Sequence, residues 1–391
     1  MKTRILIISI ILLLMNACKD DEVGHTKPCN LNFNDTSAQH PKAAQYQALI
    51  DNYTKLGLPG IVLLIRDSSG LWIGSSGKAD IEKDIDMAPC MVSKVASITK
   101  MFMGVLVLQL VDEGVLALDE KISTWLPAGT IEKIENADQV TLRQLMNHTS
   151  GIYDVISDQG FYLELLNKPE QFWTPESILE YVYGKPAAFE PGTSMGYSNT
   201  NTLLISMIIE AATGRKHNEL MHERIIDPLG LENTFYYYHD ELPEYTAQGY
   251  YDLYNNGTIL NLTNYNTGSG NGYTGLYCSV RDLQLFIEAL FVNKVLLSDS
   301  MLAEMQTYTE MDPEAHRAFG LGIFKDFMER PADEYALGHR GRDLAYSADA
   351  FWFPKNNTTM AFLINYGTNG NSALREVFFQ FRTDLSDLIF D

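Results

Sequence analysis

A long hydrophobic run covers residues 98–111, where the sequence reads ITKMFMGVLVLQLV. Apolar residues occupy almost every position, which predicts a helix buried on all sides rather than one lying on a surface. Gly114 follows the run and suits the C-terminal cap of that helix. Earlier in the chain, apolar runs at 60–66 and 71–75 flank a polar turn at 67–70, and this alternation predicts a β-hairpin.

The remaining segments are unevenly distributed. Residues from about 120 to 260 show helical periodicity broken by proline and glycine, and a helix is expected from 276 to about 293. Strand-like runs follow at 320–324, 335–338, 348–353 and 358–365, and then a final helix at 372–388. Strands at both ends predict an α+β fold with one antiparallel sheet and flanking helices. We expect a sheet domain from 45–120 and 261–391, and an inserted, mostly helical domain at 121–260.

Ser97 and Lys100 stand at the start of the 98–111 helix. A serine there lies where backbone N–H groups are unpaired, and Lys100 is one turn further on the same face. Burial favours the neutral form of an ammonium, and a neutral amine can take a proton from serine. The alternative is a helix-start serine followed by a lysine that extends to solvent. Ser75 and Lys78 have the same spacing, but they lie in a strand-and-turn stretch.

Two further motifs follow in the chain: Tyr197-Ser198-Asn199 after a turn, and His339-Arg340-Gly341 after a strand-like run. With Ser97-x-x-Lys100, this order resembles the serine β-lactamase-related hydrolases, which include class C β-lactamases, D-alanyl-D-alanine carboxypeptidases and esterases. The segments 145–152, 189–199, 228–234 and 275–283 fit the same resemblance, which covers about residues 45–390. The resemblance implies the same two-part architecture, with the active site in the cleft between the parts.

The resemblance also implies roles for these residues. Ser97 would attack a carbonyl to form an acyl-enzyme, and Lys100 and Tyr197 would share the proton transfer, with a lowered pKa for the tyrosine hydroxyl. Asn199 would orient the substrate amide or Lys100, and it could equally cap a helix. His339 would hydrogen-bond Tyr197 or the substrate, with a merely structural role as the alternative.

The His339 motif also implies an oxyanion hole. Gly341 would allow the backbone to approach the substrate, and the Arg342 and Ser97 N–H groups would bind the oxyanion. Because side chains alternate along a strand, we expect one of Arg340 and Arg342 to point into the cleft and clamp a substrate carboxylate. Pairing with Asp343 or Asp349 is the alternative. For His148, in the 145–152 segment, we expect a structural role.

Other motifs carry less weight. Gly192-x-Ser194-x-Gly196 matches the nucleophile elbow of another hydrolase class, but no buried strand precedes it. His222-Glu223 lacks the second histidine of a zinc motif, and no Cys-x-x-Cys occurs, so neither a metal nor a cofactor is expected.

The N-terminus predicts export. Lys2 and Arg4 precede an apolar run at 5–15 that is too short to span a bilayer and suits a signal peptide, 1–17. Cys18 after Ala17 resembles a bacterial lipoprotein cleavage site, so we expect a lipid on Cys18 and an irregular tether at 18–44. Cleavage to a soluble form and an uncleaved anchor are the alternatives. The expected location is the outer membrane, cell surface or periplasm, with membrane contact through the lipid only.

Charge and cysteine content narrow the partners. Removing residues 1–17 deletes two positive charges and no negative ones, which takes the formal charge from −21 to −23. Such an acidic protein would repel nucleic acid. Of Cys29, Cys90 and Cys278, three cannot all pair, so no disulfide framework is expected. We expect a monomer that binds a small-molecule or peptide acyl substrate.

Taken together, the motifs predict an exported serine hydrolase that cleaves an amide or ester through an acyl-enzyme. A true β-lactamase is disfavoured because His339 stands where class C β-lactamases have lysine. Two alternatives stay open: an acyltransferase that passes the acyl group to an alcohol or amine, and a penicillin-binding sensor that acylates without turnover.

Overall fold

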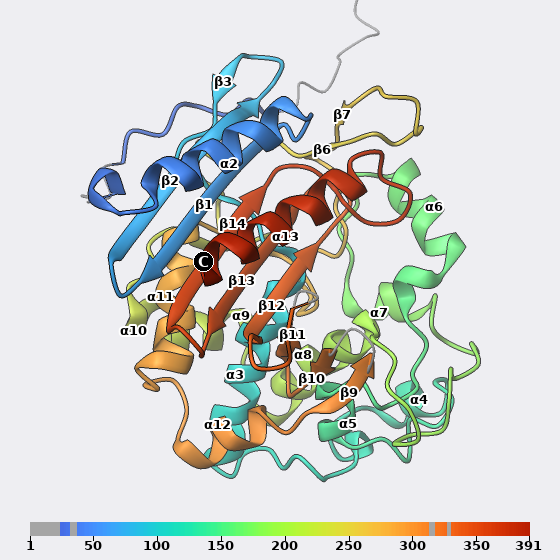
Figure 1. Ribbon diagram of the computed structural model, residues 1–391. Helices are drawn as coiled ribbons and strands as arrows, with labels where there is room; N and C mark the ends of the chain where they lie inside the picture. Colours follow the sequence, from blue (N-terminus) through green and yellow to red (C-terminus); the bar gives the residue numbers. More distant parts are fainter. Residues whose placement is uncertain (1–23, 32–36, 313–316, 327–329) are drawn as a thin grey trace, which may run out of the picture.

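The computed structural model describes residues 24–31, 37–312, 317–326 and 330–391 (Figure 1). The expected signal peptide and Cys18 lie outside the described residues. A nine-stranded antiparallel sheet has the order β3-β2-β1-β14-β13-β12-β11-β10-β9. Its central pairing joins β1 (Gly60–Asp67) to β14 (Thr358–Ile364), so strands from the two ends of the chain lie side by side. The predicted α+β fold with a sheet built from both termini is confirmed.

The sheet's other strands are β2 (Gly70–Asp80), β3 (Ile85–Asp86), β9 (Thr309–Asp312), β10 (Arg317–Phe319), β11 (Phe324–Asp326), β12 (Ala336–Arg342) and β13 (Ser347–Phe353). The expected strand at 320–324 is wrong, because residues 320–323 form the turn between β10 and β11. Gly322 has φ +85° there and packs against Gly104 of the central helix. A side chain at either glycine would collide with the other segment's backbone.

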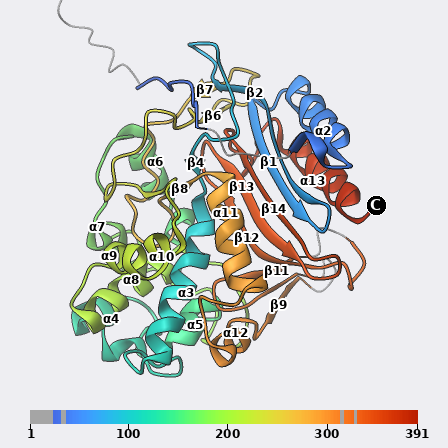
Figure 2. The same ribbon diagram turned by 90° about the vertical axis from the view of Figure 1, so that its left-hand side faces the viewer.

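Helices cover both faces of the sheet. Figure 2 shows α2 (Ala43–Lys55) and α13 (Arg375–Phe390) on one face, and α3 (Thr99–Asp112) and α11 (Val280–Ile287) on the other. Successive side chains of a strand point to opposite faces of the sheet, so they pack into two separate cores, one on each face. As its composition predicts, α3 is buried along almost its whole length.

The segment between α3 and β8 is mostly helical and irregular. It holds α4 (Ala128–Ile131), α5 (Leu142–Met146), α6 (Gln159–Asn167), α7 (Pro175–Leu179), α8 (Asn199–Thr213), α9 (His217–Met221) and α10 (Asp227–Leu229). It also contributes β5 (Thr234–Tyr236), β6 (Tyr250–Tyr251) and β7 (Leu260–Asn261). Strand β5 joins β4 (Ser93–Lys94) and β8 (Leu276–Cys278) in a small sheet beside the start of α3. The domain boundary near 260 stays a prediction.

Short helices complete the described chain: η1 (Ser37–Gln39), η2 (Ala96–Ile98), η3 (Ile122–Thr124), η4 (Val155–Ser157), η5 (His222–Ile226), η6 (Glu288–Val292) and α12 (Asp299–Met305). Across the described ranges, no helix combines the length and apolar character needed to cross a bilayer.

The N-terminal segment corrects two expectations. Cys29 and Cys90 form a disulfide across 61 residues, although no disulfide framework was expected, and Cys278 is free and buried. Two of the three cysteines could have paired, but the sequence alone does not show which two lie close together in the fold. Residues 24–31 have no regular secondary structure, but they are held against the folded body. The Thr26 N–H donates to the Asp80 carboxylate at 3.2 Å.

Candidate active site

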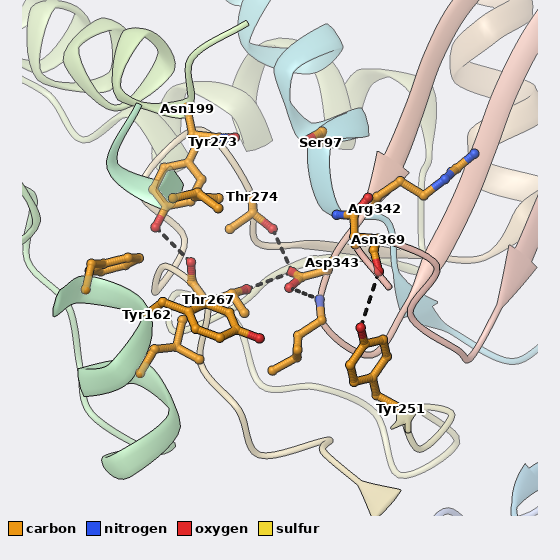
Figure 3. Close-up of a pocket in the computed structure, with 15 residues that line it drawn as sticks. Ser97, Tyr162, Asn199, Tyr251, Thr267, Tyr273, Thr274, Arg342, Asp343 and Asn369 are labelled. Atoms are coloured by element: carbon orange, nitrogen blue, oxygen red, sulfur yellow. Dashed lines mark hydrogen bonds between the residues drawn. The ribbon is translucent and has the colours of Figure 1, made fainter. Parts of the chain in front are cut away.

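Ser97 lies in η2, one turn before α3 begins at Thr99. The 3₁₀ turn places the half-buried serine at the wall of a cavity of about 310 Å³ (Figure 3). The preceding residue, Ala96, has φ +48°, a left-handed conformation that costs roughly 1–3 kcal/mol in a non-glycine residue. The surrounding packing holds this strained backbone in place and so fixes the direction of the serine side chain.

Lys100 is buried beside Ser97. Its Nζ donates to Ser97 Oγ at 3.0 Å, to Asn199 Oδ1 at 2.8 Å and to the Tyr273 carbonyl at 2.6 Å. Burial lowers the pKa of Lys100 to about 7, against the opposing effect of the Asp154 and Asp343 carboxylates. Near neutral pH a substantial fraction of this amine is therefore unprotonated and within reach of the serine proton.

Tyr197 reaches the same hydroxyl from the segment just before α8. Its hydroxyl interacts electrostatically with the Ser97 hydroxyl, which opposes the effect of burial on its pKa, and Lys100 Nζ lies 5.2 Å from its ring centroid. Burial raises the pKa of Tyr197 above its ordinary value, so the expected lowering of that pKa is wrong. A neutral lysine nearby contributes little positive charge, and burial penalises the phenolate. The ring packs against His148 in a tilted arrangement, with centroids 4.3 Å apart.

Asn199 opens α8, and Ser198 is the residue at the N-cap position. The Asn199 side chain therefore does not cap the helix but accepts from Lys100 and donates to Asp154 Oδ1 at 3.2 Å. Asp154 also accepts from the Asn199 N–H at 2.9 Å. Sequence reasoning missed Asp154, which fixes the amide orientation that Lys100 requires. Its position shortly after the 145–152 segment was the available signal.

Gly341 and Arg342 bring the sheet close to Ser97. A Cβ at Gly341 would lie 1.9 Å from the Val95 carbonyl oxygen, so only glycine permits this approach. The Asp343 N–H donates to Tyr346 O, and hydrogen-bonded pairs alternate along an antiparallel ladder, so the Arg342 N–H faces away from β13. Strand β11 pairs with β12 only at Ala336–Gly338, which leaves that N–H directed to the Ser97 side.

The side chains of Arg340 and Arg342 do not serve the cavity. Figure 3 shows the Arg342 guanidinium pointing away from the pocket, where it pairs with Asp349 at 2.7 Å. Arg340 lies 3.6 Å from Asp326. The expected carboxylate clamp is therefore wrong, because residues two apart in a strand share a face, and here both face α13. Pairing of Arg342 with Asp349 was the alternative reading, and the pair is buried.

His339 is fully buried behind Tyr197. Its Nδ1 lies 2.7 Å from the Arg340 carbonyl oxygen, and its Nε2 has no hydrogen-bond partner among the described residues. The His339 and Tyr197 ring centroids are 6.5 Å apart, so the rings are neighbours without a direct hydrogen bond. Burial keeps the pKa of His339 well below its ordinary value, and the ring is neutral.

The cavity has one apolar wall and one polar wall. Ile156, Phe161, Tyr162 and Leu165, from η4 and α6, form the apolar side. The polar side contains Thr267, Thr274 and Asp343, and Tyr251 and Asn369 lie at its rim (Figure 3). A ligand carbonyl at Ser97 would thus have a hydrophobic surface on one side.

The remaining motifs lie elsewhere. Ser75 and Lys78 both lie on β2, where Ser75 donates to the Met87 carbonyl and Lys78 pairs with Asp86 of β3 at 2.6 Å. Residues 192–196 form an irregular loop with no preceding strand, unlike a nucleophile elbow. Within the described part of the chain, no group of three side chains could hold a metal ion.

The fold and this site are those of a β-lactamase-fold serine hydrolase. The family model described as Beta-lactamase matches residues 46–380, and the chain belongs to that family. The structure of a D-stereospecific amidohydrolase from Streptomyces sp. is similar, with 31% identity, a TM-score of 0.75, and coverage of 82% of this chain and 94% of that one.

More distant relatives share the fold. D-amino acid amidase from Ochrobactrum anthropi SV3 is 24% identical with a TM-score of 0.76, over 88% of this chain and 97% of that one. Protein flp of Staphylococcus aureus (strain MRSA252) is 24% identical over 82% of this chain and 62% of its own length. The chain therefore spans less than two thirds of Protein flp.

Proposed function

We propose that this protein hydrolyses amides or esters through an acyl-enzyme on Ser97. The observation that carries the proposal is the 3.0 Å hydrogen bond from the buried Lys100 amine, whose pKa is about 7, to the half-buried Ser97, with the Tyr197 hydroxyl interacting with the same serine. Neutral Lys100 would accept the serine proton, directly or through the Tyr197 hydroxyl, as Oγ bonds to the substrate carbonyl carbon. The Ser97 and Arg342 N–H groups would bind the oxyanion.

Collapse of that intermediate expels the leaving amine or alcohol, which takes the proton from Lys100 or Tyr197. Water then loses a proton to Lys100 or Tyr197 as its oxygen attacks the carbonyl carbon of the acyl-ester. The ester bond to Ser97 breaks, the acid is released, and Ser97 Oγ takes the proton back. Asn199, held by Asp154, would keep Lys100 aimed at the serine throughout.

The cavity supports an acyl group that is apolar and carries no carboxylate. Among the fifteen described residues that line it, Arg342 alone has a cationic side chain, and Asp349 holds that guanidinium outside the pocket. The apolar wall of η4 and α6 suits a hydrophobic side chain. A neutral or amine-bearing amide, of the kind a D-amino acid amidase cleaves, fits better than a carboxypeptidase substrate or a penicillin, since both of those carry a carboxylate.

The test compares matched substrates with the wild-type protein and Ser97→Ala. We expect hydrolysis of D- or L-phenylalanine amide and of a neutral aryl ester, at least tenfold faster than of the same ester bearing a carboxylate, and no turnover by Ser97→Ala. Intact-protein mass spectrometry would follow the acyl adduct. An adduct that persists for hours would instead favour a sensor, and products formed with an added alcohol would favour acyl transfer. Equal labelling of Ser97→Ala would refute the nucleophile assignment.

We also propose that the protein is exported and lipidated on Cys18. The Cys29–Cys90 disulfide supports an oxidising compartment. Labelling of growing cells with a palmitate analogue should tag the wild-type protein and not Cys18→Ser. Equal tagging of both would overturn lipidation at that residue.

A further inference from the structure

A buried polar cluster, Lys94, Thr267 and Asp343, lies at the polar wall of the cavity. Its one part in the proton transfer described above is the electrostatic effect of Asp343 on Lys100. Lys94 Nζ lies 2.7 Å from Asp343 Oδ2 and 2.6 Å from Thr267 Oγ1. Thr267 Oγ1 in turn donates to Asp343 Oδ2 at 2.7 Å. Only 3% of Lys94, 8% of Thr267 and 9% of Asp343 is exposed, so the three groups form a closed triangle away from solvent.

The three residues come from three separate segments that border the site. Lys94, on β4, precedes Ser97 by three residues. Asp343 directly follows Arg342, at the end of β12. Thr267 stands in the loop that leads to Tyr273, whose carbonyl accepts from Lys100, and the Tyr273 hydroxyl donates back to the Thr267 carbonyl at 2.8 Å.

A buried ion pair is weak evidence for stability, because desolvation of both charges offsets much of their attraction. Such a pair fixes geometry more than it lowers free energy, and here it joins the backbone segments of the two oxyanion-hole donors. A binding role for the Asp343 carboxylate is less consistent with its contacts. Its Oδ2 is occupied by Lys94 and Thr267, and its Oδ1 accepts from the Leu344 N–H at 2.6 Å.

We propose that the Lys94–Thr267–Asp343 cluster is a positioning clamp that sets the separation of the Ser97 and Arg342 N–H groups. This inference rests on the proposed function, because it assumes that those two groups bind the oxyanion. The cluster acts through the backbone and does not touch the reacting atoms.

The test uses Lys94→Met, Asp343→Asn and Thr267→Val, with Lys94→Arg as the conservative variant. Thr267→Val breaks the triangle without leaving an unpaired charge, and it covers the case in which a charge variant fails to fold. A matched control is Asp282→Asn: Asp282 is 3% exposed and holds Thr234 on β5, away from the cavity. Each variant is assayed for kcat and KM on the best neutral substrate and for thermal unfolding. Its affinity for a boronic acid, which binds serine as a tetrahedral adduct, is also measured.

A misplacement near 1 Å costs on the order of 100-fold in rate, so we expect kcat and boronate affinity to fall about 10- to 100-fold with KM changed less than about threefold. Lys94→Arg should recover part of the loss, and Asp282→Asn should lower stability without changing boronate affinity. Unchanged kcat and boronate affinity in all three cluster variants would overturn the clamp. A raised KM with unchanged kcat would overturn it in favour of substrate binding. If the wild-type protein neither turns over nor reacts at Ser97, the proposed function fails and the clamp fails with it.

Discussion

In the proposed mechanism, the pKa of Lys100 sets the pH range in which Ser97 is activated. Burial lowers it to about 7, and Asp154 and Asp343 resist that shift. His148 and His339 also face the lysine, but burial lowers the pKa of both, so they stay uncharged. We therefore expect the rate of serine phosphonylation by a fluorophosphonate to rise with pH through about 7 and then level off.

Asp154→Asn provides the matched comparison for this profile. Removing a nearby negative charge makes the lysine easier to deprotonate, so the rising limb should move to lower pH. A rate independent of pH between about 5.5 and 8.5 would contradict the assignment of Lys100 as the titrating base. If the rise in phosphonylation rate occurred at the same pH in Asp154→Asn as in the wild type, a group other than Lys100 would be titrating.

The same lysine affects folding stability. In the unfolded chain its pKa is near 10.5 and in the folded protein about 7, so between these values the unfolded state binds more protons. The Lys100 contribution therefore destabilises the fold fully below pH 7 and is relieved as pH rises toward 10.5, with a slope approaching about 1.4 kcal/mol per pH unit. Urea unfolding of the wild-type protein and Lys100→Met between pH 7 and 9.5 should show this slope in the wild type only.

Lys121→Met serves as the control for that measurement, because Lys121 is exposed and its removal should leave the pH dependence unchanged. Parallel unfolding curves for the wild type and Lys100→Met across the range would mean that the buried amine keeps its charge. Lys100 would then need a base to deprotonate it before it could activate Ser97.

Single residues show where sequence reasoning succeeds and where it stops. Spacing within one element is local, so the Ser97–Lys100 contact could be predicted from helix geometry. The expectation that one of Arg340 and Arg342 points into the cleft was wrong. Residues two apart in a strand lie on the same face, so both side chains point the same way. Asp154 was missed because its place after the 145–152 segment gives only its neighbourhood, and nothing local indicates that this carboxylate will meet Asn199 across 45 residues.

At the scale of elements, the approach of β12 to η2 leaves no room for a side chain at Gly341. Gly341→Ala would place a Cβ 1.9 Å from the Val95 carbonyl, so the strand or the turn must move. We expect kcat to fall at least about 100-fold because the Arg342 N–H is displaced, and stability to fall by about 1–3 kcal/mol. Steady-state kinetics and urea unfolding check the two effects.

Gly129→Ala is the matched control, since no atom lies within 4 Å of a Cβ at that position in α4. It should leave kcat unchanged. If Gly341→Ala retained wild-type kcat, the β12 backbone could not be part of the oxyanion hole.

The elements also explain the one expected strand that failed. Residues 320–324 are apolar and glycine-rich, which is typical of a buried strand, but the glycines serve a turn that packs on Gly104 of α3. Hydrophobicity indicates that a segment is buried but not by which element. Here the segment is buried because the turn packs against α3. Distinguishing the two requires knowing which element lies opposite, and that is tertiary information.

At the scale of the whole molecule, the β1–β14 pairing makes the two chain ends interdependent. The alternation of apolar runs predicted that both ends contribute strands, and the order of motifs predicted the cleft. Neither pattern could predict how the N-terminal segment is fixed, because residues 24–31 carry no regular secondary structure. Their position depends on Asp80, on Thr246 and on the disulfide, all far from them in sequence.

The Cys29–Cys90 disulfide closes a 61-residue separation and should stabilise the fold mainly by restricting the unfolded chain, by about 2–4 kcal/mol. We expect Cys29→Ser to lower the unfolding temperature and to abolish the effect of a reductant on it, with kcat unchanged because neither cysteine lines the cavity. Thermal unfolding with and without dithiothreitol measures this. Cys278→Ala, which removes the buried free thiol, should instead keep the reductant sensitivity. If the reductant left the wild-type unfolding temperature unchanged while mass spectrometry showed both thiols free, the N-terminal segment would be held by its hydrogen bonds alone.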